Sequence, residues 1–146
     1  MVTSCQLMTA KNLYSIIGQQ EDTNASLLSL QKELSSMGNH VFFDANSYSI
    51  RSEDVQTLSN LGSWLREHDC DLLIEGFADE QDTGNNGIAL GFRRAYSVFD
   101  DLVARGIQPS RMKVTSYGNK APAVFGYDED SGAKNRRAVV VLRGCR

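Results

Sequence analysis

Apolar residues first recur at helical spacing between residues 24 and 37. Thr23 or Asn24 can cap a helix there, and Gly38 can end it. The simpler interpretation of its apolar stripe is packing on the domain core, which we prefer to a partner helix in a coiled coil. The stripe comprises Leu27, Leu28, Leu30, Leu34 and Met37.

Two further helical patterns alternate with β-prone runs at residues 40–43, 72–74 and 112–117. Ser52 can cap the first of these helices, and Gly106 can end the second. The run at 72–74 is continuously apolar, as expected of a strand in a sheet that helices cover. The inward residues are expected to be Val55, Leu58, Leu61, Trp64 and Leu65 in the first helix, and Ile88, Ala95, Val98, Phe99 and Leu102 in the second.

The last part of the chain combines a long loop with the most β-prone run of the sequence. The loop spans residues 118–134, and the strand spans residues 137–142. Two strand–helix–strand units require right-handed crossovers between parallel strands, while a last strand reached without a helix can insert antiparallel. The sequence therefore predicts an α/β (α+β) domain, in which a mixed four-stranded sheet carries its helices on one face, after a short N-terminal helix.

The length and charge of the chain restrict the range of possible functions. The 146 residues suffice for one domain with a core. They contain no apolar run of the roughly 18–20 residues that crosses a bilayer. A formal net charge of −3 and a sequence pI of about 5.3 disfavour a nucleic-acid surface. A partner that carries ammonium groups, or charges of both signs, fits this balance better.

Three cysteines occur, and two of them suggest a disulfide. Cys70 precedes one predicted strand and Cys145 follows the last one, so antiparallel neighbouring strands would bring them within reach in an oxidising compartment. Cys5 stands apart, because residues 2–4 resemble the end of a bacterial lipoprotein signal, whose cysteine is acylated. A lipid anchor at Cys5 and an ordinary cysteine in an N-terminal tether both stay open.

Residues that support catalysis or metal binding are sparse. His40 and His68 are the only histidines, and the sequence has neither a serine elbow nor a phosphate-binding glycine motif. Two acidic clusters, at residues 79–82 and 128–130, lack the ligand spacing of a calcium loop and are better explained as solvated loops. We therefore expect no enzyme, no cofactor and no metal site.

The junction between the buried strand and the helix after it carries two opposite charges. Asp79 follows the strand at the sheet edge where open α/β folds place ligands, and Arg94 lies on the following helix. Held on opposite walls of a cleft, the carboxylate would take an ammonium group and the guanidinium would take a carboxylate. From spacing alone, a zwitterion receptor and a pair that bonds to itself or faces solvent are equally open.

Five segments in order resemble motifs of the OmpA-like C-terminal domain family, between about residues 41 and 143. Within this family the chain is most similar to the peptidoglycan-associated lipoproteins. The resemblance implies a βαβαββ fold and non-covalent binding of the peptidoglycan peptide stem, in the periplasm and at the outer membrane of a Gram-negative bacterium. The segments are residues 41–44, 74–80, 90–95, 114–118 and 135–138.

The same resemblance implies which residues bind the stem. Asp79 matches the aspartate that takes the ammonium group of diaminopimelate, and Arg94 matches the arginine that takes its carboxylate. Asn46 matches a polar position that lines the cleft, while Leu90 and Arg137 match positions near it. The implied partners are peptidoglycan, the outer membrane through a lipid anchor, and other subunits of an envelope complex, with no nucleic acid.

Four positions depart from the family pattern: Phe77 replaces a histidine, Ala45 an aromatic residue, Gly87 an asparagine and Phe92 a glutamate. These changes remove hydrogen-bonding groups and an apolar wall but keep the two charged residues. We expect a cell-wall anchor or, alternatively, a structural subunit of a secretion system or flagellar ring that uses the fold for protein docking, with weak or lost wall binding. The expected organisation is a tether at residues 1–23, a short amphipathic helix at 24–40 and the OmpA-like domain at 41–146.

Overall fold

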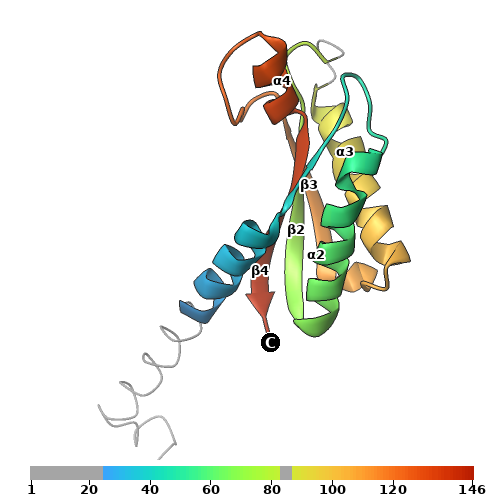
Figure 1. Cartoon of the computed structure of the whole chain (residues 1–146), viewed down its shortest axis with the longest axis vertical. Helices are drawn as coiled ribbons and strands as arrows, with labels where there is room; N and C mark the ends of the chain where they lie inside the picture. Colours follow the sequence, from blue (N-terminus) through green and yellow to red (C-terminus); the bar gives the residue numbers. More distant parts are fainter. Residues whose placement is uncertain (1–24, 83–86) are drawn as a thin grey trace, which may run out of the picture.

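The computed structural model describes residues 25–82 and 87–146 (Figure 1). A helix over residues 25–37 opens the described part and ends at Gly38, whose φ of +116° is a backbone conformation that glycine adopts readily. Leu34 of this helix is fully buried in the core, which agrees with the preferred packing. Leu28 was wrongly placed on the inward face and is 65% exposed. The expected caps Thr23 and Asn24, the tether and Cys5 lie outside the described residues.

A four-stranded mixed sheet forms the centre of the molecule, and its strands stand in the order β1-β4-β2-β3. β2 and β3 are parallel, while β4 lies antiparallel between β1 and β2. This confirms the predicted mixed sheet and the antiparallel insertion of the last strand. The strands are β1 (His40–Phe42), β2 (Cys70–Phe77), β3 (Met112–Gly118) and β4 (Arg137–Cys145).

Two long helices lie along one side of the sheet, as Figure 1 shows. They are α2 (Val55–Glu67) and α3 (Gly87–Ala104), and short 3-10 turns precede α2 (Ser52–Asp54) and β3 (Pro109–Arg111). No helix within residues 25–82 and 87–146 combines the length and apolarity needed to cross a bilayer. The one-sided arrangement confirms the predicted fold class.

Three details of the helices differ from the sequence prediction. Ser52 does not cap α2, because it begins the 3-10 turn and its hydroxyl contacts the Glu53 carboxylate at 3.2 Å. Val55 opens α2 one turn before its first buried residue and is 47% exposed. Ile88 is 38% exposed, because the buried stripe of α3 passes beside it.

A further short helix, α4 (Glu129–Asn135), interrupts the loop predicted at 118–134. It has no apolar stripe to signal it, since its buried residues are Ser131, Gly132 and Asn135. The Asn135 side chain accepts hydrogen bonds from the backbone of Ala123 and Val124 and so fixes the preceding loop. α4 therefore holds its loop through polar contacts and places it against the upper end of the sheet in Figure 1.

Two glycines let α3 approach the sheet closely. A Cβ at Gly76 of β2 would overlap the backbone carbonyl of Gly91 in α3, and a Cβ at Gly91 would overlap the Ser116 hydroxyl of β3. Arg94 lies one helical turn after Gly91. The close contact therefore brings the Arg94 side chain to the carboxyl end of β2.

At the opposite end of the sheet, a disulfide joins Cys70 and Cys145. The two residues are direct partners in the antiparallel register of β2 and β4. The bond ties the start of β2 to the end of β4, which are 75 residues apart in the sequence.

Candidate functional site

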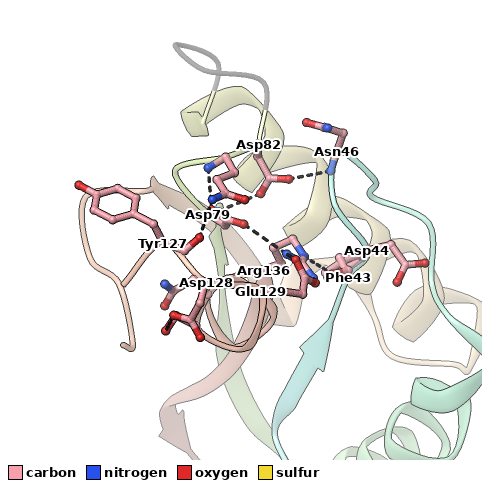
Figure 2. A network of polar contacts seen from close by, with 12 residues as sticks. Phe43, Asp44, Asn46, Asp79, Asp82, Tyr127, Asp128, Glu129 and Arg136 are labelled. Carbon is pink, nitrogen blue, oxygen red and sulfur yellow. Dashed lines mark hydrogen bonds and ion pairs between the residues drawn. The ribbon is translucent and has the colours of Figure 1, made fainter. Parts of the chain in front are cut away.

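Four charged side chains from different parts of the chain meet beyond the carboxyl end of β2. Asp79 and Asp82 follow that strand, Arg94 comes from α3, and Arg136 joins α4 to β4. All four are buried, with exposed fractions between 0 and 7%. Figure 2 shows Asp79 and Asp82 between the loop that carries Asn46 and the loop that carries Tyr127. Buried charges of this kind are stable only when each one has a partner.

Arg94 uses its whole guanidinium on neighbours within the chain. Its Nε donates to the Ser47 carbonyl at 2.8 Å, and its two terminal nitrogens donate to the carbonyls of Phe77 (3.0 Å) and Asp44 (3.1 Å). The same two nitrogens also donate to Asp82, at 2.9 and 3.2 Å. An arginine side chain has five N–H donors. All five of them are therefore engaged.

Asp82 is surrounded by donors on both of its oxygens. Besides Arg94, the backbone N–H of Asn46 reaches its Oδ1 at 2.6 Å and that of Asp79 reaches its Oδ2 at 2.9 Å. Burial alone would raise the pKa of Asp82, but the hydrogen bonds from Arg94 and from the two backbone groups outweigh burial and lower the pKa. Asp82 is therefore the ionised counter-charge of Arg94.

Asp79 is held differently. Its Oδ2 accepts from Arg136 at 3.2 Å, and its Oδ1 accepts the backbone N–H of Gln81 at 2.6 Å. α4 comes so close that a Cβ at Gly132 would stand 2.6 Å from the Asp79 carboxylate. A carboxylate offers about four acceptor positions. Within residues 25–82 and 87–146, the Asp79 carboxylate accepts these two hydrogen bonds, whereas that of Asp82 accepts four.

Arg136 secures the Asp79 side of the cluster to the rest of the fold. It donates to the Phe43 carbonyl at 2.9 Å and to the Glu129 carboxylate at 2.6 Å. Burial opposes its charge, but the hydrogen bonds from Arg136 to Glu129 and Asp79 raise its pKa. Arg136 thus joins the loop after β1, α4 and the end of β2, as Figure 2 shows.

The structure places Asp79 and Arg94 in one cluster, but neither bonds to the other and neither faces solvent. Each has another partner, which neither alternative of the sequence analysis anticipated. Asn46 lies on the loop after β1 with a φ of +56° and presents its backbone N–H to Asp82. Leu90 is buried on α3, one turn before Arg94.

Arg137 lies over the ring of Phe77, with the guanidinium carbon 3.7 Å from the ring centroid. Burial lowers the pKa of Arg137, against the opposing charge of Glu75. Phe77 is itself buried, with an exposed fraction of 6%. This part of the surroundings is therefore a cation–π stack next to the Asp79 strand end.

The interpretation of residues 79–82 as a solvated acidic loop is wrong, because Asp79 and Asp82 are buried and only Glu80 among the three acids is exposed. Sequence reasoning also missed Asp82 and Arg136 as members of the cluster. A buried arginine requires a carboxylate, but nothing in the spacing distinguishes Asp82 from Glu80 as that partner.

A groove of about 170 Å³ lies beside the cluster, on the side of α4. The Gln81 side chain donates to the Tyr127 carbonyl at 2.6 Å and so links the Asp79 loop to the wall of the groove. Phe125 and Tyr127 are 89% and 74% exposed. The lining comprises Glu80, Pro122, Val124, Phe125, Gly126, Tyr127 and Asn135.

Comparisons with known proteins agree on the family of this chain. The model of the OmpA family matches residues 42–137. A peptidoglycan-associated lipoprotein of Brucella melitensis is 41% identical over 109 residues, which are 74% of this chain and 65% of the relative. One from Pasteurella multocida is 39% identical over 110 residues, or 75% of this chain and 73% of the relative. The chain thus spans slightly less than two thirds of the length of the Brucella protein.

Solved structures show the same fold. The peptidoglycan-associated lipoprotein from Burkholderia pseudomallei superposes with a TM-score of 0.68 at 35% identity, covering 72% of this chain and 90% of that one. The periplasmic domain of Helicobacter pylori MotB gives 0.63 at 20% identity, with coverages of 71% and 70%, which supports the fold alone. With its fold, the motif order and these identities in agreement, the chain belongs to the OmpA family and is similar to peptidoglycan-associated lipoproteins.

Proposed function

We propose that this chain binds the peptide stem of peptidoglycan without covalent chemistry and so holds an outer-membrane lipoprotein to the cell wall. The chain acts in the periplasm, in association with the outer membrane of a Gram-negative cell. The names of its relatives support a role in wall binding rather than catalysis. The observation that carries the proposal is the buried cluster of opposite charges at the carboxyl end of β2.

The ligand group we propose is diaminopimelate, whose side chain carries an ammonium and a carboxylate on one carbon. Asp79 supports recognition of the ammonium, because its carboxylate accepts two hydrogen bonds from the described residues, out of about four possible, and lies at the sheet edge. Arg94 is the proposed partner of the carboxylate, because its two terminal nitrogens, which bond to Asp82 in this structure, form the fork that a carboxylate would bind. The walls of the proposed site beside these two residues include Asn46, Leu90 and Arg137. Their proposed role is to shape the site rather than to bind a charged group of the ligand.

Retention on purified sacculi tests the proposal. We expect the wild-type protein to sediment with sacculi and Asp79→Asn to lose retention, because an amide no longer attracts an ammonium group. Asp54→Asn is the matched control, since Asp54 is equally buried and forms a 2.9 Å ion pair with Arg51. Equal retention of all three proteins would contradict the Asp79 site. Absence of wild-type retention would instead support the docking module of an envelope complex.

We also propose that Cys5 carries the lipid, with residues 1–23 as a tether and residues 24–40 and 41–146 as helix and domain. The helix at residues 25–37 contacts the domain directly, because its Gln31 side chain accepts the Leu142 backbone N–H at 2.8 Å. This contact supports treating the helix and the domain as one packed unit. The intact mass of the protein from a membrane fraction tests the acylation. A mass equal to the bare polypeptide would contradict the anchor at Cys5.

A further inference from the structure

The two halves of the proposed site are not equally accessible to a ligand. Among the described residues, the Asp79 carboxylate accepts two of about four possible hydrogen bonds, whereas each of the five donors of Arg94 already has a partner. Three of these partners are backbone carbonyls that a ligand cannot replace without moving the chain. The other two bonds go to Asp82, whose side chain is the removable one.

We propose that Asp82 is an internal substitute for the ligand carboxylate and sets the specificity of the site. Its carboxylate grips the Arg94 fork with both oxygens, at 2.9 and 3.2 Å, which is the bidentate geometry that a bound carboxylate would adopt. The proposal rests on the proposed function, because the ligand is the diaminopimelate residue of the stem.

The surroundings of Asp82 strengthen this interpretation. The backbone N–H groups of Asn46 and Asp79 complete a pocket of four donors around one carboxylate, and the whole side chain is buried. Such a set of donors lowers the pKa of Asp82 and would hold any carboxylate in the same place. The pocket is therefore a built carboxylate subsite that the chain fills with its own residue.

A consequence follows for the ligand that wild-type protein accepts. A free diaminopimelate carboxylate must displace Asp82 or remain next to it, and two like charges at one position repel each other. A stem in which this carboxylate is amidated avoids the repulsion. Wild-type protein should therefore recognise the ammonium through Asp79 and discriminate little between free and amidated stems.

Binding of two purified muropeptides, with a free or an amidated diaminopimelate carboxylate, tests the specificity. We expect wild-type affinities within about threefold of each other. Asp82→Ala should bind the free form at least tenfold more tightly than wild type does and should prefer it to the amidated form. Asp82→Asn, which keeps the size of the side chain, should change the preference in the same direction. Wild-type preference for the free form by tenfold or more, unchanged in Asp82→Ala, would overturn the proposal.

A second measurement needs no muropeptide. Formate has the size of the carboxylate that Asp82→Ala deletes, so at constant ionic strength it should raise the melting temperature of Asp82→Ala but not that of wild type. Asp54→Ala should not respond, because Arg51 keeps carboxylates of Asp44 and Glu53 within 3.8 and 3.6 Å. If the added carboxylate stabilises Asp82→Ala but neither wild type nor any variant binds a muropeptide, the wall-binding function is contradicted and the carboxylate subsite is supported. Absence of rescue would overturn the internal substitute.

Discussion

Replacing Arg94 by methionine separates its role in the fold from any role in binding. The change removes five hydrogen bonds from a fully buried side chain and leaves the Asp82 carboxylate without its cation. Removing one partner of a buried ion pair typically costs about 3–5 kcal/mol. The free energy of unfolding of a domain is typically about 5–15 kcal/mol, so Arg94→Met should lose a large part of it.

Urea unfolding measures this loss, with the fluorescence of Trp64 as the signal. Trp64 is the single tryptophan of the chain and is buried in the core. With a denaturant slope of about 2 kcal/mol per molar, a loss of about 4 kcal/mol lowers the urea midpoint by about 2 M. A midpoint lowered by less than about 0.5 M would refute the reasoning.

The double variant Asp82→Asn/Arg94→Met sharpens the interpretation. It removes the stranded carboxylate together with the guanidinium, so it should be more stable than Arg94→Met alone by about 1–3 kcal/mol. A double variant as unstable as Arg94→Met would show that the lost carbonyl contacts, rather than the buried charge, dominate the cost. Sacculus retention of any Arg94 variant is informative only where this assay shows a folded protein.

Three further predictions concern the rest of the fold. Because the folded-state pKa of Asp82 is lowered, its contribution to stability is present above about pH 4 and is lost as the pH falls through the folded pKa. Between pH 7 and pH 2, the urea midpoint should therefore fall less in Asp82→Asn than in wild type. The Cys70–Cys145 bond closes a loop between residues 75 positions apart, so its reduction should lower the unfolding free energy by about 4 kcal/mol. Urea curves with and without reductant measure this loss. Gly76→Ala should cost about 2–3 kcal/mol in the same assay, because its Cβ would meet the backbone of α3. The control Gly144→Ala, which has open space around it, should cost less than about 1 kcal/mol. Equal costs would contradict the close approach of α3.

The sheet could be predicted from the sequence because its strands signal themselves through apolar runs. Residues 137–142 form the most β-prone run, and in the structure they belong to β4, one of the two central strands, which is buried on both faces over Ala138–Val140. No apolar helical pattern precedes this run in the sequence, and its antiparallel direction could be predicted for that reason. Such features depend on local pattern and on connection length, which a sequence displays directly.

The charged cluster could be predicted only in part, because burial and partner choice depend on tertiary contacts. Asp79 and Arg94 stood out by position, but the sequence does not show that Arg94 pairs with Asp82 and that Asp79 pairs with Arg136. Arg136 reaches Asp79 across 57 residues, and it does so because Gly132 lets α4 approach. α4 itself stayed hidden, since a short polar helix that packs through a glycine has no apolar periodicity.

The central position of β4 also determines when the sheet can form. β4 pairs with β2 and β1, whose partner residues lie 62 to 99 positions earlier, and Asn39 contacts Val140 across 101 residues. Strand pairing between residues so far apart in the sequence is slow, and a strand without its partner exposes unsatisfied backbone groups. Until the last strand pairs, the edges of β1 and β2 that face β4 therefore lack their partner in the sheet. The period of greatest aggregation risk ends only when Cys145 comes opposite Cys70, and the disulfide then makes that late step difficult to reverse.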